Sequence, residues 1–208
     1  MTKEASGLES SPRPDSKSQT GSGSGQDSSD LTTEGADSGD GGGTPTPEPQ
    51  ADPLEQLELN DHGNEQVDKG ESAIFQDLSS DEEYAKLTAT NVRTNFKCTA
   101  DDAPESINGQ YVALSFDVNA FDALNNSGFT ELYFSVHDFR AWDGDGEKVI
   151  DVVGNAESCI SEDERIQTPI LPGNEASGLV VLDVPEGDGS ASFTLGGFEG
   201  AYGWEWSW

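Results

Sequence analysis

The chain has 208 residues, of which 32% are hydrophobic, and its 41 acidic and 10 basic side chains give a formal net charge of −31. Residues 1–83 carry 20 acidic and 4 basic side chains, and residues 84–208 carry 21 and 6, so the acidity runs through the whole chain. A field of this sign repels nucleic acids and anionic membrane surfaces, and we therefore expect no nucleic-acid partner. No apolar run is long enough to predict a transmembrane segment.

The N-terminal part of the chain divides into two segments by composition. Residues 1–52 are mainly Ser, Gly, Thr, Asp and Pro, which bury too little apolar surface to offset the entropy of ordering, so we predict a disordered acidic linker. Residues 53–83 are transitional. Their short acidic stretches place a few apolar residues at helical spacing, which predicts a partly helical or disordered segment.

From residue 84 onward the hydrophobic pattern changes to period two, with turns rich in Gly, Asp and Asn between the runs. The clearest run alternates Val112, Leu114, Phe116 and Val118 with the residues between them. Further strands are expected in the runs 84–98, 130–142, 146–153, 177–185, 190–198 and 203–208. About seven short strands without a convincing helix predict an all-β fold, an antiparallel β-sandwich over residues 84–208. Residues 156–169 are expected to be a loop or a single helical turn over an edge of the sandwich.

The two cysteines, Cys98 and Cys159, favour a disulfide, because neither has the spacing of a metal site or a histidine cluster nearby. The bond would close a loop of roughly 60 residues and stabilise the fold by about 4 kcal/mol on the chain-entropy model. It implies an oxidising, extracytoplasmic compartment, with reduced cysteines in the cytosol as the alternative. The N-terminus has no apolar signal-peptide core, so we expect a signal or lipoprotein leader to precede Met1 in the native gene.

The acidic stretch at residues 143–147 has two interpretations, a calcium loop and a hairpin turn. Counted from Asp143, a helix-flanked calcium loop needs glycine at the sixth position and glutamate at the twelfth, where this chain has Lys148 and Gly154. Glycines at the second and fourth positions instead suit the positive φ of a hairpin turn. We favour the hairpin and retain Asp143, Asp145 and Glu147 as weak candidate ligands of a surface cation.

The C-terminal aromatic residues Trp204, Trp206 and Trp208 share one face of the final expected strand. They would form either a ligand surface for carbohydrate or, as we favour, part of a core packed against the opposite sheet.

Enzymatic motifs are weak in this sequence. His137, expected on a strand beside Asp138, would need a nearby serine to form a hydrolase site, and the chain has no nucleophile elbow. Phosphate loops, dinucleotide glycine patterns and zinc spacings are also missing from the sequence. We therefore predict no enzymatic activity and no cofactor.

Four segments occur in an order that resembles a known family. In chain order they are AKLTATNVR (85–93), GQYVALSFDVNAF (109–121), FRAWDGDGEKV (139–149) and ILPGNEASGLVVLDVPEG (170–187). Together they resemble a bacterial lipoprotein-type domain of unknown function with a telokin-like, immunoglobulin-like fold, related to the immunoprotective extracellular antigen family. The resemblance covers residues 84–208 and none of the linker.

The resemblance implies an extracytoplasmic, often lipid-anchored module of no established activity. Its members place a linker like residues 1–52 after a lipidated cysteine, an anchor that this sequence lacks. We therefore predict a non-enzymatic extracellular or cell-surface module on a flexible tether that binds an envelope or extracellular protein or polymer. Two alternatives remain open: a structural spacer without a specific ligand, and a carbohydrate-binding module that uses the C-terminal tryptophans.

Overall fold

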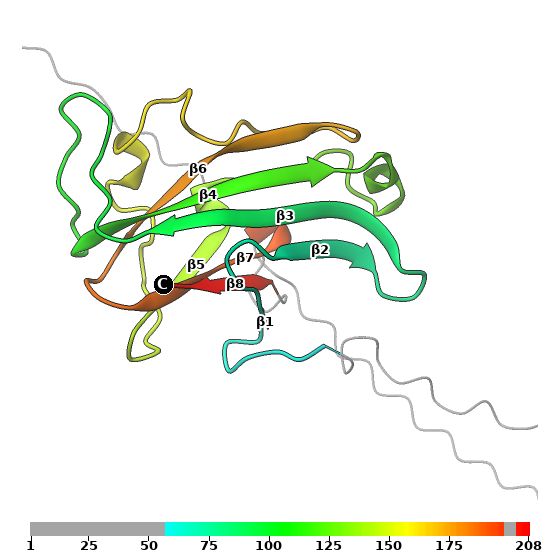
Figure 1. Cartoon of the computed structure of the whole chain (residues 1–208), viewed down its shortest axis with the longest axis horizontal. Coiled ribbons are helices and arrows are strands. Elements are labelled where there is room, and N and C mark those ends of the chain that lie inside the picture. The colour runs from blue at the N-terminus through cyan, green and yellow to red at the C-terminus, as the bar shows by residue number, and fades with distance from the viewer. Residues whose placement is uncertain (1–56, 198–202) are drawn as a thin grey trace, which may run out of the picture. The chain divides into compact units, whose positions relative to one another are not determined.

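The computed structural model describes residues 57–197 and 203–208 (Figure 1). The linker predicted over residues 1–52 lies outside these ranges. Within them the chain forms β-strands and short 3-10 turns and no α-helix, which confirms the predicted all-β class. None of the helical turns in these residues is long and apolar enough to cross a bilayer.

Two four-stranded sheets pack face to face (Figure 1). The first sheet has the order β1-β8-β7-β5 and the second has the order β2-β3-β4-β6. The strands are β1 Glu65–Gln66, β2 Ser72–Asp77, β3 Glu82–Arg93, β4 Gln110–Ala120, β5 Phe139–Asp143, β6 Glu175–Val184, β7 Gly189–Phe193 and β8 Trp204–Ser207.

The connectivity is that of an immunoglobulin-like sandwich. The chain changes sheet between β1 and β2, and then at each step from β4 to β7, and the latter three changes make the Greek-key pattern. All strand pairs of the described chain are antiparallel except β1 with β8, which run parallel. The predicted antiparallel sandwich is therefore confirmed, with one parallel pair at its edge.

The core lies between the inner faces of the two sheets. On β4, Val112, Leu114, Phe116 and Val118 are all buried, as their alternation predicts. The Phe116 ring meets Trp206 of the opposite sheet edge to face, with centroids 5.0 Å apart. The sequence pattern thus identifies the inward face of this strand correctly.

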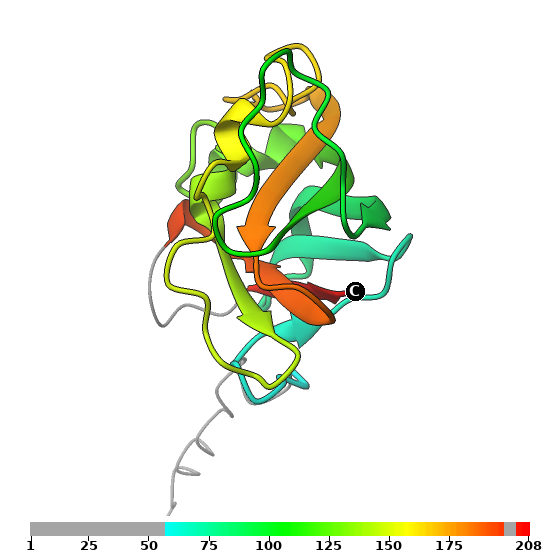
Figure 2. The ribbon, with the colours of Figure 1, turned by 90° about the vertical axis from the view of Figure 1, so that its left-hand side faces the viewer.

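A second, smaller cluster lies on the outer face of β4 and β6. Tyr111 and Ala113 of β4 and Val181 of β6 are buried there against Ile160 and Cys159. Their burial depends on the segment around residues 156–160, which covers this end of the sheet as a 3-10 turn, Ala156–Ser158, followed by irregular chain (Figure 2). This agrees with the expected loop or helical turn over residues 156–169.

The prediction for residues 53–83 is wrong in the part of that segment that the structure describes. It contains the strands β1 and β2 instead of helix, and the sandwich therefore begins before residue 84. β2 pairs with β3 and buries Ala73, while β1 pairs with the C-terminal strand β8. The β1–β8 pairing joins segments that are far apart along the sequence, so local apolar spacing does not reveal it. β2 and β3 are consecutive strands that form a hairpin across residues 78–81, which the sequence analysis missed.

Two predicted strands are present only in part, since the run 130–142 is a strand only from Phe139 onward, in β5. Residues 130–138 make one isolated bridge, Leu132 with Ile170, before Ser135 and Asp138 cap each other and turn the chain into the 3-10 helix Val136–Asp138. The return strand at 146–153 is reduced to one bridge at Lys148. Asp151 then accepts hydrogen bonds from the two amides that follow Val152, which turns the chain away from the sheet.

Candidate functional site

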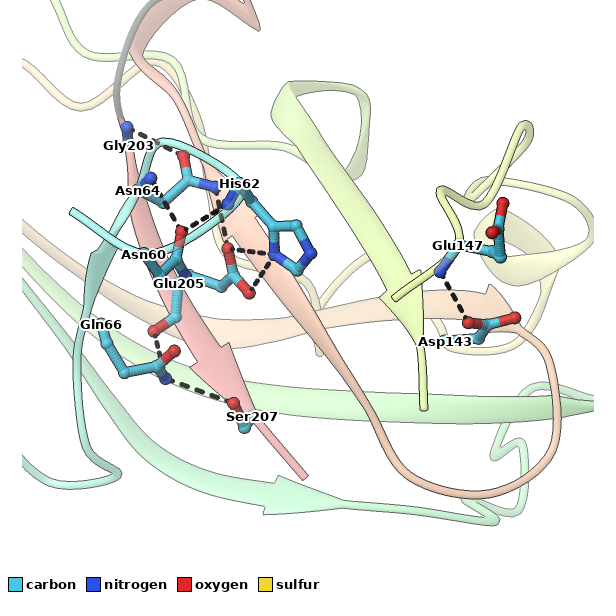
Figure 3. Close-up of polar contacts among 9 residues, drawn as sticks. All are labelled: Asn60, His62, Asn64, Gln66, Asp143, Glu147, Gly203, Glu205 and Ser207. Carbon is cyan, nitrogen blue, oxygen red and sulfur yellow. Dashed lines mark hydrogen bonds and ion pairs between the residues drawn. The ribbon is translucent and has the colours of Figure 1, made fainter. Parts of the chain in front are cut away.

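The acidic turn after β5 is a hairpin turn. One oxygen of the Asp143 carboxylate accepts the backbone N–H groups of Asp145 and Glu147 at 3.0 and 2.9 Å. The Glu147 carboxylate points away from Asp143 (Figure 3). In the described residues no three carboxylate, histidine or cysteine side chains gather closely enough to hold a metal ion. A calcium titration followed at the Gly144 and Gly146 amides tests the weak cation candidate formed by Asp143, Asp145 and Glu147.

The tryptophan residues do not form the ligand surface considered from the sequence. Trp204 and Trp206 are 2% and 1% exposed, because their side of β8 faces the opposite sheet. Trp208 is partly buried, and its indole N–H donates to the carbonyl of Gly187 at 3.2 Å. The favoured interpretation, burial in the core, holds for the first two residues.

His137 and Asp138 have separate partners. His137 lies in the 3-10 helix and not on a strand, and its Nε2 is 3.2 Å from the exposed Glu157. The Asp138 carboxylate accepts both the backbone N–H and the hydroxyl of Ser135 at 3.0 Å, as a helix cap. The structure therefore does not bring these two residues together as a histidine oriented by a carboxylate.

A polar cluster absent from the predicted sites surrounds Glu205 on the outer face of β8 (Figure 3). His62 donates from Nδ1 to both carboxylate oxygens at 2.9 and 3.2 Å, and Asn64 donates at 2.8 Å. The His62 ring also stacks on Trp142, with centroids 4.1 Å apart. The side-chain oxygen of Asn64 also accepts the backbone N–H of Gly203, so Asn64 binds both the Glu205 side chain and the backbone just before β8.

The carboxylate of Glu205 is 2% exposed. Its burial opposes ionisation, but hydrogen bonds from Ser190, Asn60, His62 and Asn64 outweigh that effect and hold the pKa below its ordinary value. The cluster joins the start of the described chain to its last strand. In the sequence the cluster shows only as a glutamate between two tryptophans that face the core. Alternation along the strand would place this glutamate in solvent.

The disulfide predicted from the sequence is present between Cys98 and Cys159. A backbone hydrogen bond reinforces this link, because the carbonyl of Cys159 accepts the N–H of Thr99 at 2.9 Å. The bond therefore holds the 94–109 loop against the 156–160 segment at one end of the sandwich (Figure 2).

Two loops at this same end are held together by Asp183, a fully buried aspartate of β6. Its two carboxylate oxygens accept the Ser106 hydroxyl at 2.5 Å and the backbone N–H groups of Ile107, Asn108 and Asn155 at 3.0–3.1 Å. Glycine is required beside it, because a Cβ at position 154 would lie 2.5 Å from the carboxylate. We call residues 104–109 and 150–155 the end-loop platform.

The end-loop platform presents two apolar side chains to solvent. Ile150 is fully exposed and Ile107 is 63% exposed. Their loops are joined directly, since the Asn108 amide donates to the carbonyl of Asp151 at 2.7 Å. A rigid frame that holds isoleucines outward is the arrangement expected of an interaction surface. Sequence reasoning missed it, because Ile150 lay in a predicted strand.

Comparison with known proteins finds two similar solved structures and no family. No protein-family model matches the chain. No curated protein matches it either. Among solved structures, the chain is similar to the YjhA protein from Bacillus subtilis, with 13% identity, a TM-score of 0.37, and coverage of 61% of this chain and 79% of that one. It is also similar to an uncharacterized β-sandwich protein from Clostridium difficile, with 14% identity, a TM-score of 0.37, and coverage of 73% and 99%.

Proposed function

We propose that this chain is a non-enzymatic, extracytoplasmic binding module that engages a protein partner through the end-loop platform. The observation that carries the proposal is the pair of exposed isoleucines, Ile107 and Ile150, on loops that the buried Asp183 holds rigid. Binding through ordered loops avoids the entropic cost of ordering them on association. Loops at the ends of β-sandwiches commonly supply such surfaces.

The charges around the platform indicate the chemistry of the partner. Glu105 and Asp151 belong to its loops and are exposed, and Glu186 is exposed next to Gly109. Apolar anchors with an acidic rim match a partner surface that has an apolar patch and basic residues at its edge. A wall or envelope polymer without apolar groups would leave both isoleucines in water.

Two features support the extracytoplasmic part of the proposal. The Cys98–Cys159 disulfide persists in oxidising compartments and is rare in the reducing cytosol. The sequence resemblance to lipoprotein-type domains points to the same location, with a lipid anchor ahead of a Ser/Gly/Pro-rich tether. Carbohydrate binding by the C-terminal tryptophans is not proposed, because two of the three are in the core.

The test uses the full chain with a photo-reactive residue at position 104, and captures proteins from an envelope extract of the source organism. We expect one enriched protein with the wild type, and at least a tenfold lower yield with the double variant Ile107→Ser/Ile150→Ser. The matched control is Leu171→Ser, which removes another exposed apolar side chain, 49% exposed, outside the platform. Capture that the double variant leaves unchanged, or no enriched protein at all, would overturn the proposal and favour the spacer alternative.

A further inference from the structure

A cavity beside β6, where residues 164–166 pair with Leu179 at the edge of the second sheet, is distinct from the platform and is lined mostly by apolar side chains. Its volume is about 190 Å³. The apolar lining includes Phe134, Val136, Ile160, Ile166, Leu179 and Val181. A dry cavity of about 150 Å³ is enough to hold a benzene ring, so this one accommodates a group of that size.

Arg165 supplies the unusual feature of this cavity. The side chain lines it, and one terminal nitrogen donates to the backbone carbonyls of Glu157 and Ile160. Its Nε is buried and has no hydrogen-bond partner in the described structure. No carboxylate of residues 57–197 and 203–208 lies within 4.0 Å of its guanidinium nitrogens, although acidic residues outnumber basic ones fourfold in this chain.

The partly buried guanidinium has two backbone carbonyls as acceptors but no anionic partner among the described residues, and a carboxylate is the group that best satisfies a guanidinium. We therefore propose that the cavity binds a small apolar carboxylate, with its hydrocarbon part among Ile166, Leu179 and Val181 and its carboxylate on Arg165. The ligand's apolar part cannot exceed roughly the size of a single ring, judged from the cavity volume. This inference does not depend on the protein partner proposed above.

The mouth of the cavity is polar. His137 and Glu157 are exposed lining residues and contact each other at 3.2 Å. The Glu157 carboxylate opposes an anionic ligand, and its contact with His137 reduces that effect when the imidazole is protonated. Removing the charge of Glu157 should therefore tighten binding, whereas a site that recognises only apolar groups would not respond.

The test is a titration of the isotope-labelled full chain with phenylacetate, phenylacetamide and acetate, followed by amide shifts. We expect saturable shifts at Ile166 and Leu179 with phenylacetate, and affinities at least tenfold lower for the neutral amide and for acetate. Because this comparison uses the wild-type protein, it remains decisive if a variant fails to fold. Equal affinities for phenylacetate and phenylacetamide, shifts confined to other regions, or no saturation would overturn the proposal.

Two matched pairs of variants extend the test. Arg165→Met should abolish phenylacetate binding, while Arg93→Met should not, because Arg93 is exposed and stacks on Phe96 away from the lining residues. Glu157→Gln should strengthen binding severalfold, while Glu162→Gln, an exposed residue outside the cavity, should not. An Arg165→Met protein that is folded and binds with unchanged affinity would also refute the role of the guanidinium.

Discussion

The aspartate at position 183 offers the sharpest test of how the end-loop platform is held. Replacing it with asparagine preserves its size but exchanges one acceptor oxygen for an NH₂ group. In the more favourable amide orientation, the oxygen still accepts the amides of Ile107 and Asn155, and Ser106 can rotate to accept. The backbone N–H of Asn108 then faces another donor and loses its bond.

The size of the effect follows from these bonds. An unsatisfied buried donor costs about 1–3 kcal/mol, and the remaining bonds lose the extra strength of a charged acceptor, so we expect a destabilisation of about 3 kcal/mol. For a domain of this size the unfolding midpoint should fall by about 6–12 °C.

Calorimetry of the full chain measures the change for Asp183→Asn, with Asp145→Asn on the exposed hairpin turn as the control. Hydrogen exchange should report the loosening locally, as a loss of protection at Asn108. A midpoint within about 2 °C of the wild type, together with unchanged protection at that amide, would show that the platform is held by other contacts.

Three further predictions concern other parts of the fold. Because its folded pKa is lowered, Glu205 adds stability above its unfolded pKa that is lost as pH falls below about 4.5, so urea unfolding of Glu205→Gln should show a weaker pH dependence there. Replacing Cys98 and Cys159 with alanine opens a loop of sequence separation 61 and should cost about 4 kcal/mol by urea unfolding, a value that chemical reduction of the wild type should reproduce. A Cβ at position 178 would lie 2.3 Å from the backbone nitrogen of Ile166, so Gly178→Ala should cost at least about 1–3 kcal/mol by urea unfolding. A neutral result would mean that the chain around Ile166 can move away from β6.

The sequence predicted well those features that depend on one strand at a time. Alternation through Val112, Leu114 and Phe116 identified the core face of β4, because a strand with one face on a core repeats with period two. The same pattern missed the burial of Tyr111 and Ala113 on the other face. That burial depends on a cover from the 156–160 segment, which is distant in sequence.

The candidate site was harder to predict than the fold. Asp183 and Glu205 lie in apolar strands where the pattern would place a carboxylate in water, yet both are buried. Hydrogen-bond donors from distant loops keep both carboxylates inside the fold. Residues 106–108 donate to Asp183, and residues 62–64 donate to Glu205. Such partners follow from tertiary structure alone and have no local signature.

The position of β8 inside its sheet has a consequence for the order in which this domain can fold. β8 lies between β1 and β7, and its Trp204 and Trp206 fill the centre of the core. A chain emerging from a ribosome or a translocation channel supplies this strand after every other strand of the sandwich. Until then β1 has no strand to pair with and one edge of β7 stays unpaired, so the first sheet cannot form strand by strand in chain order. Formation of the first sheet therefore waits for the last strand of the domain.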